Sequence, residues 1–201
     1  MLGVRQSRKQ ATRERVLAAA RDLFQEVGYD EATIRLIAER AGVSVGSVFT
    51  TFSGKAEILS QVMDERLDNL YAELDQVFPH LRGPTVDRLC SIMAVHYGFE
   101  MRRLNLFVAY IGASYGWVPR EGVIPLGRNA RLQAMLRDTL RSGMERRDVR
   151  PDADVETFID TLLAAYIWNY RRASHEGANA PALIAQMDRQ IGLLYQGVAA
   201  R

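Results

Sequence analysis

The chain has 201 residues, of which 48% are hydrophobic and 25% are charged, and its formal net charge is +2. This length is enough for one or two compact domains with a sizeable core. The sequence contains neither an apolar run of membrane-spanning length nor the apolar core of a signal peptide, so we expect a cytoplasmic protein with no membrane partner. The single cysteine, Cys90, excludes an internal disulfide; it is interpreted as a small core residue, with a reactive thiol as the alternative.

The first fifteen residues are basic. They contain one acidic residue, Glu14, and five basic residues, so their net charge is +4. The basic residues are Arg5, Arg8, Lys9, Arg13 and Arg15. Such an arm can lie along DNA phosphates or in a minor groove, or it can be a solvated leader, and the sequence leaves both interpretations open. Apolar residues at helical spacing then predict a helix from about Val16 that ends at Gly28.

The most informative stretch is residues 33–55, TIRLIAERAGVSVGSVFTTFSGK. It predicts two short helices, Ile34–Arg40 after the N-cap Thr33 and Val45–Thr51 after the N-cap Ser44. Gly42 fits the turn between them, and small Ala38 lets the helices cross closely. The residues left exposed on the second helix have the geometry of a recognition helix that enters a major groove: Val45, Gly46, Ser47, Phe49 and Thr50.

Helical patterns fill the rest of the chain. A long helix is predicted from Lys55 to about Phe78, followed by helices over about 85–98, 101–114 and 126–146. Residues 115–127 hold prolines and glycines and are predicted to form a loop. A further helix starts at about Val155 and ends near Gly177, and Asn179 is a candidate cap for the last helix. Strand-like alternation is absent, so the predicted fold is all-α, with about nine helices.

These residues resemble the TetR family of transcriptional regulators. The family pattern T-x-x-x-I-A-x-x-A-G-V-S-x-G-[ST]-[LIV]-Y-x-[HY]-F-x-x-K is matched between Thr33 and Lys55 at twelve positions, and the helix before it is similar too. The resemblance implies an N-terminal three-helix DNA-binding domain over residues 1–54. It also implies a C-terminal helical domain over residues 55–201 for effector binding and dimerisation.

Two positions depart from the family pattern. The family usually has Tyr where this chain has Phe49, and His or Tyr where it has Thr51. Those family residues commonly bind backbone phosphates. Phe49 cannot donate such a hydrogen bond and Thr51 has a shorter reach. At the start of the long helix, Ser53 is predicted to supply the cap that Gly54 lacks.

The resemblance also implies roles at DNA. Thr33 and Ser47 can bind phosphate oxygens, Lys55 adds charge near a helix N-terminus, and Arg35 matches a position that can reach a base. The alternatives are capping alone for Thr33 and Ser44, a solvated surface for Arg35, and packing between helices for Phe49. The full predicted DNA-binding set is Thr33, Arg35, Ser44, Val45, Gly46, Ser47, Phe49, Thr50, Thr51 and Lys55.

Two further residue sets follow from the resemblance. Apolar stripes on the last two helices are the predicted homodimer surface, with packing inside one chain as the alternative: Phe158, Ile159, Leu162, Leu163, Tyr166, Leu183, Met187, Ile191 and Leu194. Aromatic and apolar residues of the middle helices are the predicted walls of a pocket for an unidentified, mainly apolar small molecule, although each can simply be core: Tyr71, His96, Phe99, Phe107, Tyr110, Tyr115, Trp117, Met135, Trp168 and Tyr170.

The sequence therefore predicts a dimeric repressor that a small effector releases from a palindromic operator in double-stranded DNA. The effector would tilt the long Lys55–Phe78 helix and separate the two reading heads. An activator or a DNA-bound scaffold that recruits a protein partner is the alternative. An enzyme is disfavoured because nucleophile, phosphate-loop and dinucleotide motifs are missing. His80, His96 and His175 lack metal-ligand spacing, so neither a metal nor a cofactor is expected.

Overall fold

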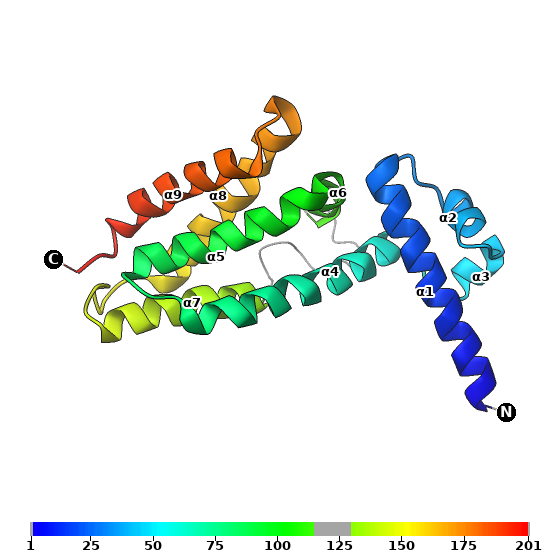
Figure 1. The fold of residues 1–201 in the computed structure, drawn as a ribbon, viewed down its shortest axis with the longest axis horizontal. Helices are drawn as coiled ribbons and strands as arrows, with labels where there is room; N and C mark the ends of the chain where they lie inside the picture. Colours follow the sequence, from blue (N-terminus) through cyan, green and yellow to red (C-terminus); the bar gives the residue numbers. More distant parts are fainter. Residues whose placement is uncertain (1, 115–129, 201) are drawn as a thin grey trace. The chain divides into compact units, whose positions relative to one another are not determined.

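The computed structural model describes residues 2–114 and 130–200. Within these ranges the regular structure is helical, apart from one isolated antiparallel bridge between Val149 and Ala199 (Figure 1). The all-α prediction is therefore confirmed. The predicted loop at 115–127 and the predicted helix start at residue 126 lie outside the described residues.

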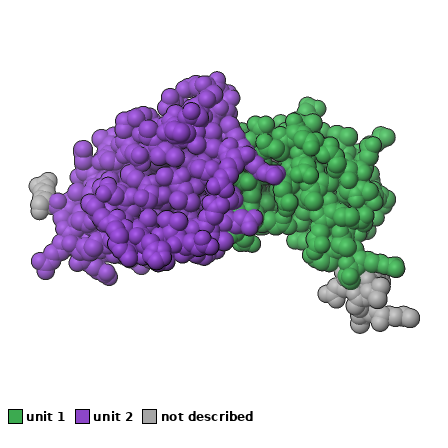
Figure 2. All heavy atoms as spheres, viewed as in Figure 1, with its two compact units in different colours: residues 1–68, 105–124 green, residues 69–104, 125–201 purple. Residues whose placement is uncertain are grey.

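The chain divides into two compact units, coloured separately in Figure 2. The first unit comprises residues 1–68 and 105–124, and the second comprises residues 69–104 and 125–201. The boundary expected at residue 54 would have placed the long helix and residues 105–114 entirely with the C-terminal part. Contacts instead group the first half of that helix, and residues 105–114, with the DNA-binding motif.

The first unit is built around α1 (Leu2–Glu26), which contacts both α2 (Ile34–Arg40) and α3 (Val45–Phe49). The unit also holds the first part of α4 (Lys55–Val77) and nearly all of α6 (Leu104–Ser114). The α1 side chains Val16, Ala20 and Phe24 are fully buried, and so are Ile37 and Val48. Figure 1 shows α2 and α3 on one side of α1. The apolar spacing that predicted these helices thus identifies their buried faces.

Helix α1 begins much earlier than its apolar stripe. The basic residues that precede Val16 continue the helix to Leu2, because Arg, Gln, Lys and Ala are good helix formers and no proline interrupts them. The arm is therefore helical. At the other end Gly28 has φ +85°, a left-handed conformation that terminates the helix as predicted.

The second unit contains α5 (Thr85–Glu100), α7 (Ala130–Glu145), α8 (Val155–Glu176) and α9 (Ala180–Tyr195), with short 3-10 helices at Phe78–His80 and Met101–Arg103. Helix α5 contacts α7 and α9, and α8 contacts the same two helices. Asp154 and Asn179 cap α8 and α9 through their side chains. Gly177, with φ +68°, closes α8 in a left-handed conformation.

A polar cluster joins the end of α7 to the start of α5. The carboxylate of Asp148 accepts hydrogen bonds from the Thr85 backbone N–H at 2.8 Å and from the Thr85 hydroxyl at 2.9 Å. Arg146 donates to the same hydroxyl at 2.9 Å. Gly143 lies against this cluster, and a Cβ atom there would come within 2.3 Å of the Thr85 hydroxyl oxygen. Only glycine fits this close approach without displacing the cluster.

Candidate DNA-binding surface and effector region

The α2–turn–α3 motif has both of its predicted caps. The Thr33 hydroxyl oxygen accepts from the Leu36 N–H at 3.2 Å, and the Ser44 hydroxyl oxygen accepts from the Ser47 N–H at 3.1 Å. Gly42 has φ +65° in the turn, as the motif predicted. The caps fix where each helix starts, and the Gly42 turn joins the two helices.

Burial separates the structural and the exposed residues of the motif. Ile37 and Val48 are fully buried and Ala38 is 2% exposed, so the crossing of α2 and α3 is tightly packed. Val45 is 40% exposed and Phe49 is 56% exposed. The alternative in which Phe49 packs between helices is therefore wrong. A short helix with an apolar exposed face suits contact with base edges, including thymine methyl groups.

The hydroxyl groups of α3 and its caps form hydrogen bonds within the motif. Both Thr50 and Thr51 donate to the Ser47 carbonyl oxygen at 2.9 Å, and the two hydroxyls of Ser44 and Ser47 lie 2.8 Å apart. Gly46 is exposed between them. Arg35, the predicted base-reading residue, is exposed on α2. The motif thus exposes the Arg35 side chain and the backbone at Gly46. The threonine hydroxyls already donate to a carbonyl oxygen of α3.

Lys55 has an internal role in this unit. Its ammonium donates to the carbonyl oxygens of Tyr29 at 2.7 Å and Asp30 at 3.2 Å, and it lies 4.3 Å from the centre of the Tyr29 ring. The side chain therefore ties the start of α4 to the α1–α2 connection through charge-assisted bonds and a cation–π contact. The sequence expectation placed its charge at a phosphate; the structure shows it holding two elements together.

The start of α4 is stabilised differently from the prediction. Ser53 does not accept a bond from the helix; its N–H and hydroxyl both donate to the Glu57 carboxylate, at 2.6 Å and 2.8 Å. This is the returning half of a capping box, in which an acid of the first turn reaches back. These hydrogen bonds lower the pKa of Glu57.

The second unit contains a buried aromatic and polar cluster. The His96 ring contacts Tyr71 and Tyr166 edge-on, with ring centres 6.1 Å and 5.9 Å away. Burial lowers the pKa of His96 to about 4, so the imidazole is neutral at pH 7. Its Nε2 atom has no hydrogen-bond partner among the described residues. Glu100, one turn further along α5, is also buried.

A satisfied hydrogen-bond network lies beside this cluster. The Tyr97 hydroxyl donates to the Tyr166 carbonyl oxygen at 3.1 Å and accepts from the Asn169 amide at 3.0 Å. Asn169 also exchanges two hydrogen bonds with Gln190 on α9, at 2.7 Å and 3.2 Å. Burial raises the pKa of Tyr97, Tyr166 and Tyr170, so these phenols are neutral donors.

The predicted effector residues fall into three groups. Tyr71, His96, Phe99, Met135 and Tyr170 are buried in the second unit, whereas Phe107 and Tyr110 are buried on α6, in the first unit. Tyr115 and Trp117 lie outside the described residues. Trp168 is 63% exposed and stacks with Arg171, so it does not belong to an enclosed wall of this chain. Helical spacing placed Trp168 on α8 but did not predict whether its side chain points into the chain or toward solvent.

The predicted dimer residues are mostly covered within one chain. On α8 and α9, the side chains of Phe158, Ile159, Leu162, Leu163, Tyr166, Leu183, Met187 and Ile191 are all buried within the chain, and Leu194 is half-buried. Helix α9 contacts both α5 and α8, so much of this apolar surface is covered by helices of the same chain. An apolar stripe indicates that a face is buried without indicating which element buries it.

The opposite faces of α8 and α9 carry exposed apolar and small residues. Thr161, Ala164 and Trp168 follow one another at helical spacing on α8, and Ala185 and Leu193 lie on α9. Leu193 is 71% exposed, the highest value among the large apolar residues that are exposed. The sequence does not single out this face, because its small residues give no strong apolar stripe.

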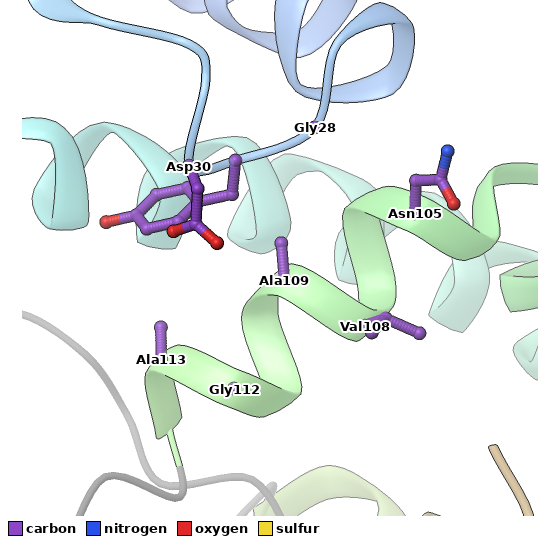
Figure 3. A pocket seen from close by; sticks show the side chains of 8 residues that line it. Gly28, Asp30, Asn105, Val108, Ala109, Gly112 and Ala113 are labelled. Atoms are coloured by element: carbon purple, nitrogen blue, oxygen red, sulfur yellow. The ribbon is translucent and has the colours of Figure 1, made fainter. Parts of the chain in front are cut away.

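A groove of about 460 Å³ lies in the first unit between the α1–α2 connection and α6. Tyr29 and Asp30 form one side, and Figure 3 shows Ala109, Gly112 and Ala113 along the facing side of α6. The small side chains of α6 leave the groove open. This feature joins two segments that are far apart in sequence, so sequence patterns alone did not predict it.

Comparison with known proteins identifies the family. Residues 16–62 match the model of the bacterial regulatory proteins of the tetR family. The HTH-type transcriptional repressor KstR2 of Mycobacterium tuberculosis is 30% identical over 146 residues, which cover 72% of each chain. The chain belongs to the TetR family of transcriptional regulators. KstR2 of Mycolicibacterium smegmatis is 26% identical over 151 residues, covering 75% of this TetR-family chain and 73% of the relative.

Solved TetR-family structures share the fold. The Thermus thermophilus repressor FadR, solved with lauroyl-CoA, aligns with a TM-score of 0.72 at 24% identity, covering 94% of this chain and 96% of that one. Bacillus subtilis FadR, solved with stearoyl-CoA, aligns with a TM-score of 0.73 at 17% identity, covering 92% and 98%. These similarities establish the all-α architecture of this TetR-family protein.

Residues 2–114 and 130–200 show neither a membrane-spanning helix nor a metal-binding cluster. None of the helices there combines the length and apolar character that crossing a bilayer requires. In the same ranges, His, Cys, Asp and Glu side chains do not gather into a group that could hold a metal ion.

Proposed function

We propose that this regulator binds a palindromic operator as a homodimer and that a small, mainly apolar effector controls the binding. The observation that carries the DNA-binding part is the capped α2–turn–α3 motif, whose short second helix exposes Val45, Gly46 and Phe49. Gly46 allows the backbone to approach the groove, and Val45 and Phe49 offer apolar contacts to thymine methyl groups. Exposed Arg35 can bind a guanine from α2.

Few base contacts come from one such helix, because α3 has only five residues. A symmetric dimer doubles them and reads two half-sites. We place the dimer surface on the outward face of α8 and α9, defined by Thr161, Ala164, Trp168, Ala185 and Leu193. Exposed Trp168 and Leu193 supply the apolar anchors, and the alanines permit close helix approach.

The effector proposal is supported by the polar centre of the second unit. His96 places an unsatisfied Nε2 atom among buried aromatic rings, an arrangement that suits an apolar ligand with one hydrogen-bonding group. The neighbours solved with lauroyl-CoA and stearoyl-CoA make acyl-CoA thioesters the first class to test. An effector acts only through unequal affinity for the DNA-binding and released states.

Helix α6 is the proposed route from effector to DNA. It follows Arg103 of the second unit directly and belongs with the first unit from Asn105 onward. Its groove against Tyr29 and Asp30 leaves room for displacement of α6 within the first unit. Since Lys55 is bonded to the same connection, such a displacement would reach the start of α4 as well.

The deciding experiment selects ligands from a randomised duplex pool with the purified protein. We expect a palindromic winner whose affinity falls steeply with salt, and release of that duplex by lauroyl-CoA or stearoyl-CoA. Failure to enrich any duplex would refute the operator proposal. Enrichment without release by either thioester would refute the acyl-CoA class, and a protein partner captured on the duplex would favour the scaffold alternative.

A further inference from the structure

A second polar feature of the first unit lies beside the recognition motif. Lys9, Gln10 and Arg13 of α1, together with Thr51 at the end of α3, line an open hollow of about 550 Å³. Lys9 and Arg13 are four residues apart and therefore share one face of α1. The side chains of Lys9, Gln10 and Arg13 can donate hydrogen bonds to a ligand, and two of them carry positive charge, which is the chemistry of an anion site.

The two cations of this hollow have an aromatic ring and two carboxylates as neighbours. Arg13 is held in place by the Phe52 ring, whose centre lies 5.7 Å from the guanidinium carbon. Glu57 accepts from Ser53 and Gln61 and is attracted to Arg13, and Glu14 accepts from Gln10, so both carboxylates have partners within the unit but keep their charge. Lys9 is exposed, so its ammonium can adjust to an incoming anion.

The hollow lies beside the end of α3, where this chain lacks the two side chains with which the family pattern commonly binds phosphates. Phe49 has no hydroxyl, and the Thr51 hydroxyl donates to the Ser47 carbonyl. A helix end that has lost two phosphate-binding side chains is thus flanked by two cations from another helix.

We propose that Lys9 and Arg13, with Gln10, bind a backbone phosphate of the operator beside the recognition helix. The inference rests on the proposed DNA-binding function and adds a contact to it. Because a phosphate carries no sequence information, the site strengthens binding to operator and to random duplex alike.

The test compares two double variants that remove the same charge from the same helix. Lys9→Gln with Arg13→Gln alters the hollow; Arg8→Gln with Arg15→Gln is the control, since neither residue lines it. The hollow variant, Lys9→Gln with Arg13→Gln, should lose one phosphate contact in each protomer. The slope of log affinity against log salt concentration should then be shallower by about 2 than in the wild type. Between 50 and 200 mM salt, the wild-type affinity should therefore fall by a factor about ten times larger than the affinity of the hollow variant. The control should keep most of the wild-type slope.

Phosphate ethylation interference gives the positional result. We expect one phosphate in each half-site whose ethylation blocks the wild-type protein and the control but not the hollow variant. Adding Thr51→His to the hollow variant should recover part of the lost affinity, because it restores a phosphate-binding side chain at the end of α3. Thermal melting checks that each variant is folded.

The outcomes separate the two proposals. Equal losses in the hollow variant and the control would show diffuse attraction by the arm and overturn the inference. Unchanged operator binding by the hollow variant would overturn it while leaving the DNA-binding function intact. A wild-type protein that binds no duplex would overturn both.

Discussion

At the scale of single residues, the helix caps link sequence to recognition geometry most directly. Thr33 accepts the Leu36 N–H, and the sequence alone predicted this cap. Replacing Thr33 with Ala should reduce the free energy of unfolding by about 1 kcal/mol, because the α2 amide is left without its partner. Thr33→Ser keeps the hydroxyl and serves as the control. Urea unfolding followed by circular dichroism measures both, and equal midpoints would contradict the prediction.

His96 connects burial to pH dependence. The pKa of its imidazole is about 4 in the folded chain, below the ordinary value of 6.5, because burial disfavours the charged form. Between these pH values the unfolded chain binds a proton that the folded chain does not. Stability is therefore fully present above pH 6.5 and is lost as the pH falls towards 4, by about 3 kcal/mol.

The His96→Gln variant isolates this contribution. Unfolding by urea from pH 7.5 to pH 4 should show a smaller loss of stability in the variant than in the wild type, since glutamine does not titrate. Parallel curves for the two proteins would mean that the imidazole is accessible to protons in the folded state. The carboxyl groups titrate in both proteins, so the difference between the curves reports His96 alone.

At the scale of elements, Gly143 shows how one missing side chain sets the junction of α7 and α5. A Cβ atom there would meet Thr85, Val149 and Asp148 at 2.3, 2.6 and 2.8 Å. Gly143→Ala should therefore lower the free energy of unfolding by about 2 kcal/mol, typical of an overpacked core. Gly98→Ala is the matched control: it lies in a helix with nothing within 4 Å of the added atom, and should stabilise by up to about 1 kcal/mol.

Helix boundaries were largely predictable from sequence because local signals determine them. Thr33, Ser44 and Asn179 cap their helices as expected, and Gly28 and Gly177 end theirs. The N-terminal extension of α1 was missed as a helix because the basic arm has no apolar stripe. Ser53 was misassigned because a first-turn acid, Glu57, satisfies it instead.

The candidate sites were less predictable, since they depend on which faces meet. Helical spacing correctly placed Leu162 and Met187 in a buried stripe, yet their partners are helices of the same chain. Trp168 was predicted to line the effector pocket, whereas its side chain is exposed. The hollow at Lys9 and Thr51 joins residues more than forty positions apart, and no local pattern encodes such a neighbourhood.

At the scale of the whole molecule, function as proposed requires two copies. Trp168→Glu together with Leu193→Glu should convert the dimer to a monomer, because two charges would be buried without partners in the interface. Analytical ultracentrifugation checks the mass, and operator affinity should fall at least tenfold as the second half-site contact is lost. Val77→Glu, at another exposed apolar residue, should leave the dimer intact. A Trp168/Leu193 variant that sediments as a dimer would place the interface elsewhere.

The scarcity of lysine has a practical consequence. Of the 26 basic side chains only Lys9 and Lys55 carry primary amines, and both lie in the first unit. The Lys55 amine is held by two carbonyl groups and a ring, whereas the Lys9 amine is exposed. An amine-selective acylating reagent should thus modify one side chain preferentially, apart from the terminal amino group. Mass spectrometry of the acylated peptide would then report occupancy of the hollow by duplex, without a substitution or a prior label in the protein.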